Sequence, residues 1–108
     1  MESQPSKFEA LFIELVLIFQ TAAMQHMGKV KNPLTDKIER NLEQARAAID
    51  MLEMIEQKTK GNLTPEELRF LETTLRDLRL NYVDEVAKNE AAQKSNMASP
   101  PQKGESNP

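Results

Sequence analysis

Glu14 is the residue whose position most suggests chemistry in this 108-residue chain, because its carboxylate stands inside an apolar run. If it were buried, it would be an acid that keeps its proton, or part of a carboxylate ring around an oligomer axis. A carboxylate at the edge of the apolar face, in contact with water or a lysine, is the favoured interpretation because an unpaired buried charge is costly. A ligand or metal site at an oligomer axis that involves Glu14 is kept as an alternative hypothesis.

The single histidine and the methionines are the next candidates. No Glu-x-x-His or His-x-x-x-His pair includes His26, so we expect it at a helix end and partly exposed. Methionines can form a flexible surface for partners, but they more often fill gaps in a core, which is the interpretation that we favour. The methionines concerned are Met24, Met27, Met51 and Met54.

The remaining polar residues show no catalytic arrangement. Lys58, Lys60 and Gly61 lack the upstream glycine and the strand that a nucleotide loop requires. No nucleophile–base pair, phosphate cradle or pair of catalytic carboxylates is apparent, so we predict no enzyme, no cofactor and no metal. The charged residues of the C-terminal half are interpreted as a solvated face with weak ion pairs. They are Arg69, Glu72, Arg76, Asp77, Arg79, Asp84 and Glu85.

The composition favours helices and excludes several classes of function. The chain has three glycines, one tyrosine, no tryptophan and no cysteine. Disulfides, thiol catalysis and thiolate metal sites are therefore ruled out. The formal net charge is −3 at pH 7 and the chain has no basic stripe, which argues against nucleic-acid binding. The absence of cysteine fits a reducing cytosol, and we expect a cytoplasmic protein.

A first helix is predicted over residues 7–27, after a short disordered start at residues 1–6. It is apolar nearly all round, whereas a surface helix needs an apolar stripe only about 100° wide. Gly28 would end it. A chain of this length cannot easily enclose such a helix, so we expect an oligomer or partner interface there. The residues assigned to that interface are Phe8, Leu11, Phe12, Leu15, Ile18, Phe19 and Ala22.

A second helix is predicted over residues 41–60, after a linker with a turn at Asn32–Pro33. Leu34 and Ile38 of the linker are expected to pack on the core. Thr35 could cap an early helix start, but Asn41 is the favoured N-cap. The apolar residues that recur at helical spacing on one face of this helix are Leu42, Ala45, Ile49, Leu52 and Ile55.

A third helix is predicted over residues 64–88. Thr64 is a typical N-cap, Pro65 suits the first helical position, and Glu67 completes a capping box. Its apolar residues recur every three or four positions, which is typical of a helix–helix seam. They are Leu68, Leu71, Leu75, Leu78 and Tyr82. Residues 89–108 are polar and are predicted to form a disordered tail.

The predicted fold is therefore all-α, with residues 7–88 as a single helical domain. The short connection before Thr64 makes the second and third helices an antiparallel hairpin. The surplus apolar surface of the first helix favours a homo-oligomer. We predict an interaction protein, such as a scaffold, adaptor or regulator, with an unknown protein partner.

Membrane contact through residues 8–27 is a less favoured alternative. A membrane span would contain Glu9 and Glu14, and a carboxylate near mid-span costs on the order of 2.5–3.5 kcal/mol on insertion scales. A helix that lies in the membrane interface usually has a basic polar face. Here the only basic residues beside the apolar run are Lys7 and Lys29.

Three segments, in this order along the chain, resemble a small bacterial family known as domain of unknown function 1844. The segments are FIELVLIFQTAAMQHMGKVKNP, NLEQARAAIDMLEMIEQKTKGNLTPEE and LRDLRLNYV. The most specific part is MLEMIEQKTKGNLTPEE at its distance from the MGKVKNP turn, and the similarity covers residues 8–86. It implies a small, mainly helical, cytosolic bacterial protein. It supplies no catalytic residue, cofactor or partner.

Overall fold

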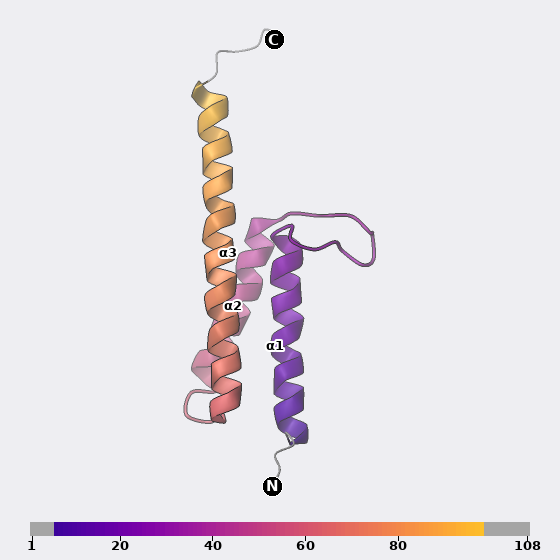
Figure 1. Ribbon diagram of the computed structural model, residues 1–108, viewed down its shortest axis with the longest axis vertical. Coiled ribbons are helices and arrows are strands. Elements are labelled where there is room, and N and C mark those ends of the chain that lie inside the picture. Colours follow the sequence, from indigo (N-terminus) through magenta and orange to yellow (C-terminus); the bar gives the residue numbers. More distant parts are fainter. Residues whose placement is uncertain (1–5, 99–108) are drawn as a thin grey trace.

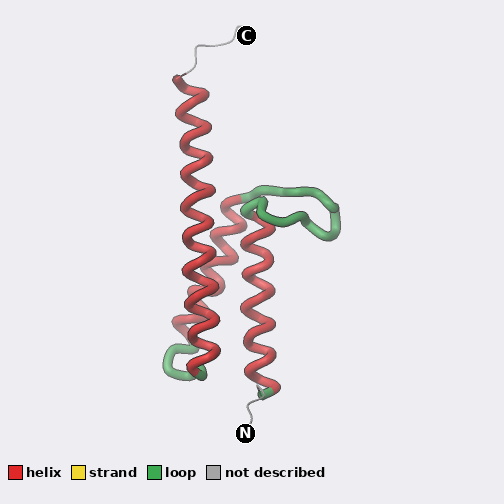
Figure 2. The backbone as a smooth tube through the Cα atoms, in the orientation of Figure 1, coloured by secondary structure: helices red, strands yellow, loops and turns green. Residues whose placement is uncertain are grey.

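The computed structural model describes residues 6–98 and consists of three helices (Figure 1). They are α1 (Lys7–His26), α2 (Leu42–Lys58) and α3 (Pro65–Ala98). The predicted all-α class is confirmed, because loops alone join the helices and residues 6–98 contain no strand (Figure 2). A disordered start was predicted over residues 1–6; Ser6 is instead the N-cap of α1, since its side chain accepts a hydrogen bond of 3.1 Å from the Glu9 N–H. Residues 1–5 and the tail beyond residue 98 lie outside the described residues.

The starts of α2 and α3 are the local features that the sequence predicts best. The side chain of Asn41 accepts a hydrogen bond of 3.1 Å from the backbone N–H of Gln44. The Thr64 hydroxyl accepts one of 3.1 Å from the Glu67 N–H, and the Glu67 carboxylate accepts one of 2.8 Å from the Thr64 N–H. The predicted N-cap of α2 and the predicted capping box of α3 are therefore confirmed.

α1 ends in a closed turn around Gly28. The Gly28 N–H donates to the Gln25 carbonyl at 3.0 Å, and the Lys29 N–H donates to the Met24 carbonyl at 2.9 Å. This pair of bonds requires a left-handed residue just past the helix, and Gly28 supplies it with φ +83°. This turn sets the direction in which the chain leaves α1 and enters the loop between α1 and α2.

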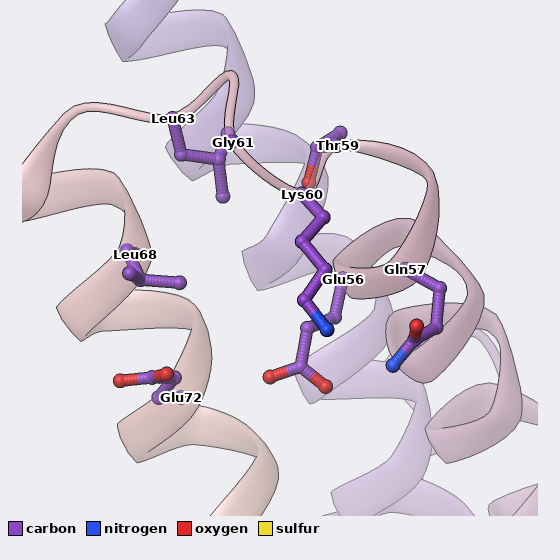
Figure 3. A pocket seen from close by; sticks show the side chains of 8 residues that line it. All are labelled: Glu56, Gln57, Thr59, Lys60, Gly61, Leu63, Leu68 and Glu72. Atoms are coloured by element: carbon purple, nitrogen blue, oxygen red, sulfur yellow. The ribbon is translucent and has the colours of Figure 1, made fainter.

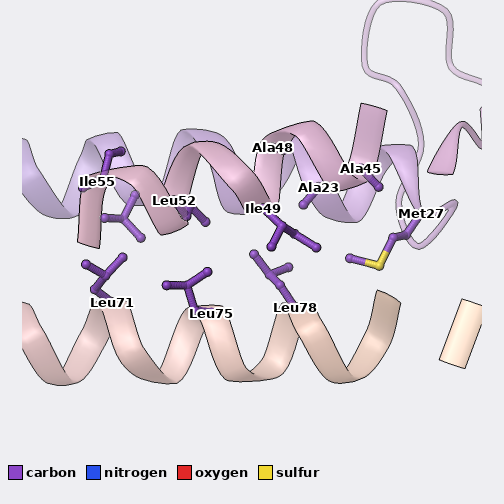
Figure 4. Packing of buried hydrophobic residues seen from close by; sticks show 11 residues of the cluster. Ala23, Met27, Ala45, Ala48, Ile49, Leu52, Ile55, Leu71, Leu75 and Leu78 are labelled. Atoms are coloured by element: carbon purple, nitrogen blue, oxygen red, sulfur yellow. The ribbon is translucent and has the colours of Figure 1, made fainter. Parts of the chain in front are cut away.

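The core lies where the three helices meet (Figure 4). α2 and α3 supply most of its apolar side chains, mostly at the positions that the spacing predicts. Leu68, the first residue of the predicted α3 row, is instead 40% exposed, and Leu42 and Tyr82 are half-buried. α1, the most apolar helix, contributes few. The buried apolar residues are Val16, Ala23 and Met27 of α1 and its end, Ala45, Ala48, Ile49, Leu52 and Ile55 of α2, and Leu71, Leu75 and Leu78 of α3. Met51 and Met54 are each 41% exposed, so placing these two methionines in the core was wrong.

α3 is longer than predicted, because it continues to Ala98 and passes the ends of the other helices (Figure 1). The predicted end near residue 88 is therefore wrong, and residues 89–98 of the predicted disordered tail are helical. The prediction relied on the lack of large apolar residues. Alanine, lysine, glutamate and glutamine are nevertheless good helix formers, and no glycine or proline interrupts residues 86–98.

The loop between α1 and α2 projects from the side of the bundle (Figures 1 and 2). Leu34 is 93% exposed and Ile38 is also exposed, so the prediction that they pack on the core was wrong. The loop closes on itself instead. The Asn32 N–H donates to the Lys37 carbonyl at 2.8 Å, and the Asn32 side chain donates to the Glu39 carboxylate at 2.9 Å. These bonds satisfy the polar groups of the loop without help from the core.

Candidate functional site

The first candidate site is an exposed apolar seam along α1. Phe8, Leu11, Leu15 and Ile18 are 77%, 49%, 40% and 57% exposed, and half-buried Ala22 continues the row. Spacings of three and four residues place these five side chains on one face of the helix. We call them the α1 seam.

The structure divides the seven residues that were assigned to an interface. Five of them form the α1 seam. The other two, Phe12 and Phe19, are half-buried and pack against the core cluster. They lie on the neighbouring face of α1, next to Val16 and Ala23. Helix periodicity shows which residues share a face, but only the packing of α2 and α3 determines which face is covered.

A second exposed row lies on α2, beside the α1 seam. Ala47, Met51, Met54 and Lys58 are exposed and are spaced by four, three and four residues. We call this row the α2 stripe. A shallow groove of about 250 Å³ joins the two rows. It is lined by Phe19, Ala22 and His26 of α1 and by Gln44, Ala47, Ala48 and Met51 of α2. The α1 seam and the α2 stripe therefore meet at Ala22, Ala47 and Met51, and we call the two rows together the α1–α2 face.

The two residues that most suggested chemistry lie at the surface or near it. Glu14 is exposed on α1, so its carboxylate is not buried within the chain. His26 is half-buried at the last position of α1, as predicted for a residue at a helix end, and it lines the groove between α1 and α2. Within residues 6–98 no three His, Cys, Asp or Glu side chains are grouped to hold a metal ion.

The second feature is a buried carboxylate at Glu85, which no pattern in the sequence predicts. Its side chain is 7% exposed and lies 2.8 Å from the Lys29 ammonium and 2.9 Å from the Arg40 guanidinium. Lys88 is 3.1 Å away. Arg40 also donates to the Glu85 carbonyl at 3.0 Å and to the Asn89 side chain at 2.7 Å. We call Glu85, Lys29, Arg40 and Lys88 the Glu85 cluster.

The three cations keep Glu85 ionised. Hydrogen bonds from Lys29, then from Arg40 and Lys88, lower the pKa of Glu85 from its ordinary value of 4.5 to about 2, although burial acts in the opposite direction. Lys29 and Arg40 stand near the two ends of the long loop. The Glu85 cluster therefore ties both ends of that loop to α3, and placing Glu85 on a solvated face was wrong.

A third feature is a cavity of about 360 Å³ between the end of α2 and the start of α3 (Figure 3). Leu63 and Leu68 give it an apolar wall, and Glu56, Lys60 and Glu72 bring charges to it. Gly61 makes the turn beside it with φ +80°, which is the role of a residue past a helix end. The cavity contains no pair of a nucleophile and a base.

α1 also has the length and composition of a membrane span. It is the one helix of residues 6–98 that passes this test, with 11% of its apolar window buried inside the structure. Core helices of soluble proteins pass the same test, but they are mostly buried. Part of the apolar surface of α1 packs against the core through Phe12 and Phe19, and the large side chains of the α1 seam are exposed.

These features define a small three-helix protein with an exposed apolar face on α1 and α2 and a long loop anchored by a buried carboxylate. A family model described as Domain of unknown function (DUF1844) matches residues 9–84. The chain belongs to this family, as the resemblance of its sequence indicated. No curated protein and no solved structure matches the chain.

Proposed function

We propose that this protein is a non-enzymatic, homo-oligomeric protein of the bacterial cytosol that acts as a scaffold, adaptor or regulator of another protein. In this proposal α2 and α3 form an antiparallel hairpin, and α1 offers its apolar surface to a second copy. The cytosolic and bacterial setting follows from the family resemblance. The observation that carries the proposal is the α1 seam, where four large apolar side chains lie exposed at the spacing of a helix–helix contact.

The physical argument is the cost of leaving the α1 seam in water. Fully burying one large aliphatic or aromatic side chain contributes about 1.5–3 kcal/mol. A symmetric contact covers the same patch on both copies, so each seam side chain counts twice. Association therefore offers a large gain in free energy by covering a surface that residues 6–98 leave exposed. Exposed apolar patches of this kind are typical of protein–protein interfaces.

Light scattering on a sizing column, over a range of protein concentrations, tests the proposal. We expect a discrete oligomer that persists on dilution. Leu15→Asp should convert it to monomer, because the carboxylate would be desolvated inside the contact. Leu17→Asp is a matched control, since Leu17 lies on the same helix with nearly the same exposure, 42% against 40%, but outside the α1 seam. A monomeric wild type, or equal behaviour of the two variants, contradicts the proposal.

Peripheral membrane binding through α1 is a second candidate, favoured by the largely unburied apolar window of this helix. Co-sedimentation with neutral and with anionic vesicles separates the two functions. The homo-oligomer is expected to stay in the supernatant with both vesicle types, because its α1 seam is covered by its own copies. Pelleting of the wild type, abolished by Leu15→Asp and kept by Leu17→Asp, would instead identify a membrane-binding protein.

A further inference from the structure

We propose that two copies dock through their α1–α2 faces, with the α1 seam of each copy packed on the α2 stripe of the other. This inference rests on the proposed function and names the surface that covers the α1 seam. It predicts a specific dimer with one two-fold axis. The argument uses the spacing of the two rows, their relative height and their charges.

The two rows match in spacing. Leu11, Leu15, Ile18 and Ala22 are separated by four, three and four residues, and so are Ala47, Met51, Met54 and Lys58. Every residue of the two rows is exposed or half-buried, and Ala22, Ala47 and Met51 line the same groove. Rows with this spacing pack as knobs and holes between helices. Methionine suits such a contact because its flexible side chain adapts to the shape of branched neighbours.

The lining of the groove fixes the relative height of the two rows. The groove is lined by residues 19–26 of α1 and residues 44–51 of α2. The His26 carbonyl accepts a hydrogen bond of 2.7 Å from the Asn41 N–H, so His26 lies at the Gln44 end of the groove and Phe19 lies at the Met51 end. Position along α1 therefore increases as position along α2 decreases. Extending this register places Glu14 about two residues, or about 3 Å along the axis, from the height of Lys58. Ala22 and Ala47 share a height at the other end, where small side chains let two helices approach closely.

The charges select one of two symmetric arrangements. A two-fold axis parallel to the helices places each α1 over the α2 of the other copy and preserves height. Glu14 flanks the α1 seam between Leu11 and Ile18, so this axis brings it close to Lys58 of the partner subunit. This opposite-charge contact occurs twice in the dimer. An axis perpendicular to the helices places α1 on α1 and α2 on α2, so Glu14 and Lys58 of the partner subunit lie over different helices. Charge complementarity therefore favours the parallel axis.

Charge reversal tests the predicted pairing. Glu14→Lys alone places two lysines together at each contact, and Lys58→Glu alone places two glutamates together. We expect each single variant to raise the dissociation constant of the dimer by about tenfold at low salt, summed over two contacts. The double variant, Glu14→Lys with Lys58→Glu, should recover the wild-type value. Sedimentation over a concentration series measures this, and failure of the double variant to recover overturns the inference.

Met51→Asp is an independent test on the α2 stripe. Met51 is 41% exposed, so the substitution should leave the fold intact, which circular dichroism checks, while the dimer weakens by more than about tenfold. Leu80→Asp is the control, because Leu80 is an exposed apolar residue on α3, away from the α1–α2 face. A wild-type oligomer that tolerates Met51→Asp overturns this inference and leaves the proposed function standing. A monomeric wild type overturns both.

Discussion

Replacing Leu75 with alanine is expected to lower the free energy of unfolding by about 3 kcal/mol. Leu75 is completely buried and lies between Leu71 and Leu78 in the buried apolar row of α3, opposite the core side chains of α2 (Figure 4). Truncating it removes apolar contacts and leaves a cavity that the three helices can fill only in part. Urea unfolding followed by circular dichroism measures the change. A domain of this size has on the order of 5–15 kcal/mol of stability in total, so the loss is a large share.

Leu80→Ala is the matched control for this prediction. It makes the same chemical change on the same helix, but Leu80 is 65% exposed. The expected loss is below about 1 kcal/mol, because little apolar surface is removed from the core. Both variants are compared at one protein concentration, since association adds to the apparent stability. Equal losses at the two positions would show that α3 does not pack through the face seen here.

Replacing Glu85 with glutamine is expected to lower the free energy of unfolding by about 2 kcal/mol. The neutral amide keeps the size of the side chain but removes the charge that Lys29 and Arg40 contact. The loss stays below that of a fully buried pair because both cations remain partly exposed and regain water. Hydrogen exchange should rise in the long loop, whose two ends the Glu85 cluster holds. Asp84→Asn is the control, since its ion pair with Lys88 is exposed.

The dependence of the free energy of unfolding on pH distinguishes an electrostatic role of Glu85 from a purely steric one. A steric role would leave this pH dependence unchanged. The pKa of Glu85 is about 2 in the folded chain and 4.5 ordinarily, so the unfolded chain binds more protons between these values. Stability from this group is therefore complete above pH 4.5 and is lost as the pH falls toward 2. Glu85→Gln should flatten that part of the curve. An unchanged slope would mean that the Glu85 cluster does not form.

Features decided by neighbouring residues could be predicted from the sequence. Asn41 and the pair Thr64 and Glu67 cap helices through bonds that span three residues. Most apolar residues predicted to pack from α2 and α3 follow the helical period and are buried, so their burial could be predicted from spacing, whereas Leu68 is 40% exposed. Gly28 and its left-handed turn are equally local. These signals need no knowledge of how the helices pack.

Features decided by distant residues could not be predicted. The Glu85 cluster joins a loop to a helix more than forty residues away in the chain, and within the sequence Glu85 resembles any acid on a charged face. Leu34 shows the limit of the rule that apolar residues are buried, since much exposed surface in folded proteins is apolar. The division of α1 into a covered and an open face depends on where α2 and α3 lie. These features depend on tertiary packing, so no local sequence pattern predicts them.

The extension of α3 gives the proposed dimer a polarity. Beyond Glu85 the helix continues for thirteen residues to Ala98, which is about 20 Å at 1.5 Å per residue. With the two-fold axis parallel to the helices, both extensions leave the assembly at the same end and point the same way. The dimer would then present two helical extensions at one end, able to bind two equivalent sites on one target. Binding at two linked sites gives a higher overall affinity than either single contact provides, without any new interaction.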